Sequence, residues 1–230
     1  MPHHDNPRRP VPAGGFTLIE LLTVIAVIGI LASILVPVVS TVRTYEKKQR
    51  TVTLFNEIAG ALESYKLKYG HYPMVAQQMT SLTAPDANGD VFFKLNDNTG
   101  FLFHVLTANF PKTDTTYAPY NPRRDPFLSV PDGMLVYSPS DTLHTNPLVG
   151  DAFGNTDIGV VVNITGNASV STTSVNSAQS VTCAETGQSA TPTLIGSENI
   201  PQSIVIFSYD NTLTPPFLTN FDYSTYATPQ

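Results

Sequence analysis

The chain contains few of the residues that mark common catalytic sites. It has one cysteine, Cys183, no tryptophan, and only 13% charged residues in 230. A single cysteine excludes a disulfide within the chain, and no group of histidines and cysteines has the spacing of a metal site. Neither a phosphate-binding loop, nor a dinucleotide fingerprint, nor a Gly-x-Ser-x-Gly motif occurs. We therefore expect a protein that is not an enzyme and that needs no cofactor.

Positive charge is scarce as well, and it is unevenly placed. The formal net charge is −6, and residues 69–230 hold thirteen acidic residues against four basic ones. Such a surface argues against a nucleic-acid partner, which would require clustered lysine and arginine. Residues 43–68 are the exception, with six basic residues against three glutamates. We expect this basic stretch to meet anionic lipid headgroups or acidic patches on neighbouring molecules.

One long apolar run stands near the N-terminus, at residues 16–39, and Glu20 is the only charged residue in it. A helix of 24 residues is roughly 36 Å long, which is enough to cross the hydrocarbon layer of a bilayer. Arg8 and Arg9 precede the run, and their charge predicts a cytoplasmic N-terminus. A carboxylate inside a membrane helix is costly, so Glu20 is expected to have a partner or a function.

Three interpretations of this run are open from the residues alone. It resembles a secretory signal that is cleaved after Ser40, but it is longer than usual and it contains Glu20. It also fits a plain single-pass anchor, in which Glu20 snorkels to the membrane boundary without a partner. In these two cases the remainder of the chain would be a secreted or membrane-tethered recognition module.

The third interpretation comes from a family resemblance. The stretch GFTLIELLTVIAVIGILA, which starts at Gly15, resembles the prepilin cleavage and methylation signature of type IV pilins and type II secretion pseudopilins. The resemblance implies that a prepilin peptidase cuts between Gly15 and Phe16 and methylates the new amino terminus of Phe16. It also implies that Glu20 pairs with the Phe16 amine of a neighbouring subunit and so sets the register of a filament.

Gly29 and Pro37 fit the same resemblance. Proline lacks the N–H that a helix needs, so the helix is weakened near Pro37. In filaments of this family the stretch between such a glycine and proline can melt and extend. The alternative is an ordinary kink, which glycine and proline often produce in membrane helices.

Helical periodicity continues beyond the apolar run, through residues 40–70. Gly70 and Pro73 then provide a helix stop. One helix from residue 16 to residue 69 would be roughly 80 Å long. Its second half carries an apolar stripe formed by Val52, Phe55, Ile58, Leu62, Tyr65 and Tyr69.

The remaining residues, 71–230, must supply the surface that covers this stripe. Strands are predicted at 134–138, 158–165 and 203–209. Residues 100–109 fit a short helix or a strand, and the prolines in 119–131 predict extended or turn-like chain. The sequence therefore predicts an α+β fold, in which a small antiparallel sheet packs on a long N-terminal helix, as in pilins.

Residues 165–191 contain twelve serines and threonines and few large apolar residues. We expect a mobile insertion there that forms no core of its own. Two other stretches are similar to the major pseudopilin branch: YKLKYGHYP at 65–73, and GDAFGN at 150–155. In the second stretch Ala152 and Phe153 replace the proline and tryptophan of the family pattern.

Two acidic stretches contain the oxygen ligands that calcium prefers. Residues 86–90 are rich in oxygen ligands, but they lack the spaced glutamate that closes such loops, so a simple turn is favoured. Some pseudopilins hold calcium in a head loop, which makes Asp210, Asn211 and Asp222 weak candidates. The histidines His71, His104 and His144 are scattered, and each is expected in a loop or at the surface.

Together these patterns predict a structural subunit of a type II secretion pseudopilus or a type IV pilus. Its expected partners are other pilin-like subunits, the prepilin peptidase, an inner-membrane assembly platform and membrane lipid. The expected location is the bacterial inner membrane, with a cytoplasmic N-terminus and a periplasmic head. The segments are a leader at 1–15, a membrane and assembly helix at 16–39, its amphipathic continuation at 40–70 and an α+β head at 71–230.

Overall fold

The computed structural model describes residues 15–76, 81–139, 141–142, 146–195 and 199–226, without the side chains of residues 36–38, 75–76 and 98–99. The chain forms two compact units, residues 1–45 and 46–230. Most of the predicted leader, residues 1–14, and His144 lie outside the described residues.

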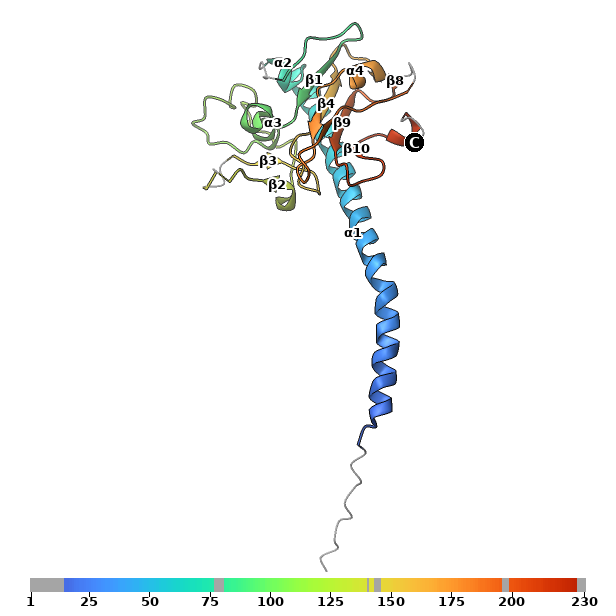
Figure 1. Ribbon diagram of the computed structural model, residues 1–230. Coiled ribbons are helices and arrows are strands. Elements are labelled where there is room, and N and C mark those ends of the chain that lie inside the picture. Colours follow the sequence, from blue (N-terminus) through green and yellow to red (C-terminus); the bar gives the residue numbers. More distant parts are fainter. Residues whose placement is uncertain (1–14, 77–80, 140, 143–145, 196–198, 227–230) are drawn as a thin grey trace, which may run out of the picture. The chain divides into compact units, whose positions relative to one another are not determined.

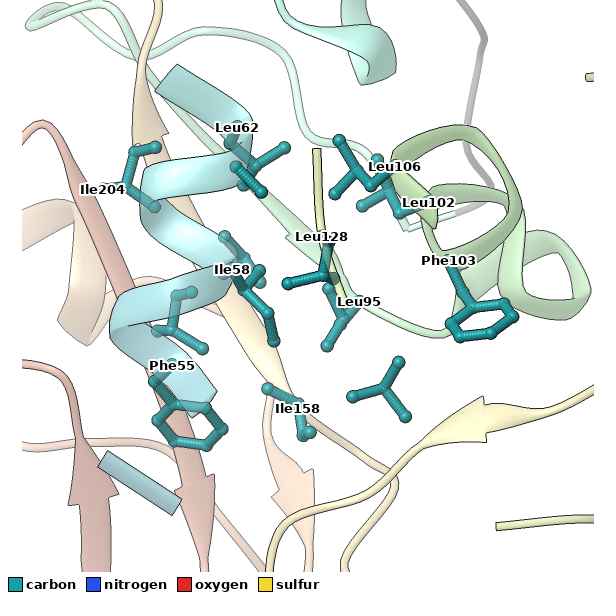
Figure 2. Packing of buried hydrophobic residues seen from close by; sticks show 14 of the residues in the cluster. Phe55, Ile58, Leu62, Leu95, Leu102, Phe103, Leu106, Leu128, Ile158 and Ile204 are labelled. Atoms are coloured by element: carbon teal, nitrogen blue, oxygen red, sulfur yellow. The ribbon is translucent and has the colours of Figure 1, made fainter. Parts of the chain in front are cut away.

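The main helix, α1, runs from Leu18 to Tyr69 and ends at Gly70, whose φ of 81° reverses the chain (Figure 1). Its predicted apolar stripe is confirmed in the second unit, where Phe55, Ile58 and Leu62 have no exposed surface. Figure 2 shows these three side chains among other buried apolar residues, including Leu102, Leu106 and Ile204. The 3.6-residue period of the sequence therefore selects the buried face of the helix.

The sheet that faces this stripe has four antiparallel strands in the order β1-β4-β9-β10. Their bounds are Asp90–Lys94 for β1, Gly159–Asn163 for β4, Ile204–Tyr209 for β9 and Phe217–Thr219 for β10. The predicted strands at 158–165 and 203–209 are confirmed as β4 and β9. The sequence prediction missed β1 and β10.

Alternate residues of the strands point to opposite faces of the sheet, and both faces are buried. In β4, Val160 and Val162 belong to the core around α1, whereas Val161 belongs to a second core on the other face. Burial on both faces explains why the central strands read as continuous apolar runs in the sequence.

Helix α3, Asp97–Thr107, completes the first core. The ambiguous residues 100–109 are thus mainly helical, and the helix places Leu102 and Leu106, one turn apart, toward α1 (Figure 2). The helix ends at Ala108, whose φ of 55° is left-handed and turns the chain into the loop that follows.

Residues 165–191 form no core of their own, as predicted, but they contribute to the second core, and their mobility stays a prediction. Val170, Val175 and Val181 are fully buried against the second face of the sheet, together with Phe207 and Tyr223. The segment itself has few large side chains, and the sheet and the C-terminal residues contribute the large side chains of this second core. Its short elements are β5 at Val170–Ser171, α4 at Thr172–Asn176, β6 at Val181–Thr182 and β7 at Ser189–Ala190.

The other elements are short. The predicted strand at 134–138 is only the two-residue β2, Leu135–Val136, which pairs with β3, Leu148–Val149. Residues 119–131 are irregular, as predicted. The remaining elements are α2 at Pro73–Ala76, η1 at Asp132–Met134, β8 at Asn199–Ile200 and η2 at Tyr223–Thr225.

Candidate functional site at the start of the long helix

The predicted processing site lies in the non-helical residues that lead into α1. Residues 15–17 have no regular structure, and the helix begins at Leu18. The Gly15–Phe16 bond therefore lies outside the helix, and the Phe16 side chain is 84% exposed. The bond thus lies in exposed, non-helical chain, which a peptidase can reach.

Glu20 is placed by a reciprocal cap at the first turn. The backbone N–H and the hydroxyl of Thr17 each donate to Glu20 Oε2 at 2.8 Å, and the Glu20 N–H donates to Thr17 Oγ1 at 3.3 Å. This is a capping box, with threonine at the N-cap and glutamate three residues later. The Thr-x-x-Glu pattern was visible in the sequence, but Thr17 was not among the predicted site residues.

The cap gives the Glu20 carboxylate a partner within its own chain. One oxygen, Oε2, is held by Thr17, while Oε1 accepts no hydrogen bond from any residue that the structure describes. The carboxylate is therefore oriented by its own helix and keeps one oxygen available. The helix dipole also favours a negative group in this first turn.

The helix surface around this site is apolar on all sides. Every residue from 15 to 35 is exposed, including Leu22, Ile28 and Leu31. By length and composition, α1 is the one helix in the described part of the chain that is able to cross a membrane. So much exposed apolar surface requires lipid or other helices to cover it.

Gly29 and Pro37 both lie within α1, and the backbone is helical at both positions. A methyl group added at Gly29 would meet no neighbour within 4 Å. The side chain of Pro37 is outside the described set. Melting of this stretch in a filament stays a prediction.

The basic stretch at 43–68 makes contacts within the second unit. Lys47 lies 5.3 Å from the ring of Phe153, and Lys48 donates to the carbonyl of Thr214 at 3.3 Å. At the far end of α1, Lys68 pairs with Asp125 at 2.5 Å, which lowers the pKa of that carboxyl group through their hydrogen bond. These lysines thus help to hold α1 to its head, and binding of headgroups stays a prediction.

The turn at 151–155, which resembles the pseudopilin pattern, is built around a buried carboxylate. Asp151 Oδ1 accepts from the N–H groups of Phe153 and Asn155, both at 2.9 Å, and Oδ2 accepts from the Asn155 amide and from Ser208 Oγ. Burial raises the pKa of Asp151, and these hydrogen bonds offset part of that shift. The N–H of Ala152 donates to Thr51 on α1 at 3.1 Å, so the turn joins the helix to the sheet.

Each of the weak calcium candidates has hydrogen-bond partners within the chain. Asp210 accepts from Thr212, Asn211 binds Thr186 and Gln188, and Asp222 accepts from Ser224 and Thr225. No group of three or more histidine, cysteine or acidic side chains with the arrangement of a metal site occurs in the described residues. Calcium binding at these positions stays a prediction.

The loop at 86–90 is a turn, as favoured from the sequence. Asp86 Oδ1 accepts from the N–H groups of Asn88 and Asp90 at 2.8 and 3.0 Å. Of the histidines, His71 is exposed in a loop, but His104 is buried, which the sequence did not predict.

Comparison with known proteins supports the prepilin interpretation. Residues 12–36 match the family model described as the prokaryotic N-terminal methylation motif. The type II secretion system core protein G of Escherichia coli K12 is 41% identical over 68 residues, which is 30% of this chain and 47% of that protein. The proteins of the same name from Klebsiella pneumoniae and Vibrio cholerae are 38% and 35% identical over 74 residues, which is 32% of this chain and 53% and 51% of those proteins.

The chain spans about half the length of the curated relatives it matches. No solved structure matches it significantly. The similarity and the motif agree with the geometry at the start of α1: an accessible Gly-Phe bond, an oriented Glu20 and an apolar helix without cover. In this N-terminal part, the chain is therefore similar to type II secretion system core protein G and carries the N-terminal methylation motif.

Proposed function

We propose that this protein is a structural subunit of a type II secretion pseudopilus, processed between Gly15 and Phe16 and assembled through α1. The observation that carries the proposal is the N-terminal methylation motif at residues 12–36. Because the relatives are type II secretion system proteins, a pseudopilus is favoured over a type IV pilus. The protein acts by assembly, without catalysis and without a cofactor.

Assembly rests on the pairing of two charges. Cleavage gives Phe16 a new amino group, which stays cationic after N-methylation. In a bundle of parallel helices, this cation lies against Glu20 Oε1 of the next copy, because the cap leaves that oxygen available. Since an unpaired charge among apolar side chains is costly, only the stagger that forms this pair is stable.

The apolar surface of α1 supplies the attraction between subunits, whereas Glu20 sets their register. Before assembly, lipid of the bacterial inner membrane covers this surface, and Arg8 and Arg9 keep the N-terminus in the cytoplasm. The head then lies in the periplasm. The partners are the prepilin peptidase, the inner-membrane assembly platform and other pilin-like subunits.

Mass spectrometry of the mature N-terminus tests this proposal. In cells with a prepilin peptidase, we expect a protein that begins at methylated Phe16, and in cells without it, one that keeps residues 1–15. A mature protein that begins at Thr41 would instead indicate an ordinary signal peptide and would contradict the proposal. A recognition module that uses the helix only as an anchor would keep residues 1–15 in both strains.

A further inference from the structure

Three basic residues, Lys47, Lys48 and Arg50, lie where the chain enters the second unit. Glu46 is the one acidic residue in the stretch 46–50, and it pairs with Arg50 at 2.6 Å on the exposed side of α1. Residues 69–230, by contrast, hold thirteen acidic residues against four basic ones. The positive charge of this stretch is therefore an exception in an acidic unit.

Neither lysine forms an ion pair with any residue that the structure describes. The Nζ of Lys47 is exposed and lies 5.3 Å from the centre of the Phe153 ring, a contact that uses none of its three N–H donors in a hydrogen bond. The Nζ of Lys48 donates to the carbonyl of Thr214 at 3.3 Å, which is long for a hydrogen bond and leaves two donors. Both ammonium groups therefore have donors for an anionic ligand.

The length of the connecting chain keeps these lysines near the membrane. The apolar run ends at Val39, and the second unit begins at Glu46, seven residues later. Seven residues of helix are about 10 Å long, and even a fully extended chain of this length spans only about 25 Å. The headgroup layer adds about 5 to 8 Å to each side of the hydrocarbon. In a bilayer that the apolar run crosses, both lysines are therefore close to the lipid headgroups.

Lipid phosphates fit these lysines better than an acidic protein does. Headgroups are present at this depth for every copy of the chain, and a lysine on its flexible stem follows mobile phosphates as a point charge. The half-buried ring of Phe153, beside Lys47, is of the kind that lies at membrane boundaries. Because the rest of the unit is acidic, an anionic membrane attracts this end and repels the remaining surface.

We propose that Lys47 and Lys48 bind the phosphate groups of anionic membrane lipids, such as phosphatidylglycerol. The proposal rests on the proposed function, because that function places residues 16–39 in the membrane. Binding holds the head near the bilayer surface before assembly, and the lysines release the lipid when the subunit enters the filament. The strength of this contact therefore contributes to the free energy that extraction of the subunit from the membrane requires.

The test uses the full chain in vesicles of phosphatidylcholine, with or without phosphatidylglycerol. The chain has no tryptophan, so Phe153→Trp provides a single fluorescent reporter beside Lys47. A lipid with a spin-labelled headgroup quenches this reporter when the head lies against the membrane. We expect stronger quenching with phosphatidylglycerol, and added salt should reverse the increase. Lys47→Gln combined with Lys48→Gln should weaken binding about 25-fold, or about fivefold for each lysine, and so remove the effect of phosphatidylglycerol.

Lys112→Gln is the matched control, since Lys112 is an exposed lysine in the loop after α3, and it should leave the quenching unchanged. Circular dichroism confirms that each variant is folded.

Four outcomes overturn the proposal. Quenching is equal in both kinds of vesicle, or the double variant responds as the parent chain does. Inorganic phosphate at constant ionic strength abolishes the effect, which indicates a site for the free anion, or quenching follows the number of copies in each vesicle and not the lipid, which indicates a second copy as the partner. The reconstituted chain keeps residues 1–15, so this test is independent of processing at Gly15 and the two proposals fail separately.

Discussion

At the scale of single residues, the capping box at the start of α1 explains how Glu20 is oriented. Thr17 supplies three of the hydrogen bonds of this box, through its N–H and its hydroxyl. Thr17→Val keeps the shape of the side chain but removes the hydroxyl. Because the loss of an N-cap costs about 1 kcal/mol, amide hydrogen exchange in the first turn should become about fivefold faster.

Thr23→Val is a suitable control for this prediction. The Thr23 hydroxyl donates to the backbone carbonyl of Glu20 and takes no part in the cap. Its removal should leave exchange in the first turn nearly unchanged. Equal effects of the two substitutions would contradict a special role for Thr17.

Tyr65 gives a prediction about pH at the same scale. Its buried hydroxyl donates to the carbonyl of Tyr120 at 2.5 Å, and burial raises the pKa of Tyr65 to about 12. The unfolded chain ionises near pH 10, so it binds fewer protons than the folded chain between pH 10 and 12. The stabilising contribution is thus complete below pH 10 and is lost as the pH rises toward 12.

Tyr65→Phe should lower the free energy of unfolding at pH 7 by about 1 kcal/mol, through loss of the hydrogen bond. It should also make the loss of stability between pH 10 and 12 less steep. Denaturant titrations in detergent at several pH values measure both effects. Tyr45→Phe, at an exposed position, should change neither.

At the scale of elements, α1 contains a glycine that its packing does not require. Gly60 is exposed inside the helix, and an added methyl group would meet no atom within 4 Å. Gly60→Ala should raise the free energy of unfolding by about 1 kcal/mol, because alanine favours the helix. Gly89→Ala should be destabilising, since Gly89 has a φ of 79° and the methyl group would lie 2.1 Å from Thr165. Stabilisation by both substitutions would contradict this account.

The turn at 151–155 joins α1 to the sheet. The Ala152 N–H donates to Thr51 of α1, and Asp151 accepts from Ser208 of β9. An asparagine at position 151 places an amide donor against the Asn155 amide, and Asn155 cannot rotate freely because its oxygen accepts from Ala184. Asp151→Asn should therefore lower the free energy of unfolding by about 1 to 3 kcal/mol. Thermal unfolding measures the change, with Asp132→Asn as the exposed control. A neutral effect of Asp151→Asn would show that the turn contributes little to stability.

The elements differ in how far the sequence predicted them. The long helix has a strong helical periodicity, and β4 and β9 are continuous apolar runs. The residues of each of these elements therefore indicate by themselves which side chains are buried. The β1 strand was missed because Asp90 and Lys94 enclose only three apolar residues, and β10 follows a proline-rich turn. The contribution of residues 165–191 to the second core was not predicted, because their core partners, such as Phe207, come from distant strands. Gly15, Phe16 and Glu20 were predicted through a contiguous motif, whereas the buried His104 depends on the tertiary fold.

At the scale of the whole molecule, the proposed function makes Glu20 necessary for assembly and unnecessary for folding. Glu20→Gln removes the charge and keeps the shape of the side chain. In cells that express the assembly machinery, sedimentable filaments should decrease at least tenfold, while membrane insertion and the fold of the head stay unchanged. Glu57→Gln, at an exposed position of α1, should assemble normally. Normal filament yield from Glu20→Gln would contradict the register role.

The most direct test of the central claim is a zero-length cross-link inside the filament. Filaments are assembled from mixed ¹⁵N-labelled and unlabelled copies, treated with a carbodiimide and digested for mass spectrometry. The account predicts an amide bond between the Phe16 nitrogen of one copy and Glu20 of another, seen as peptides that join a labelled half to an unlabelled half. Assembled filaments without this bond, or with the bond only inside single copies, would contradict it.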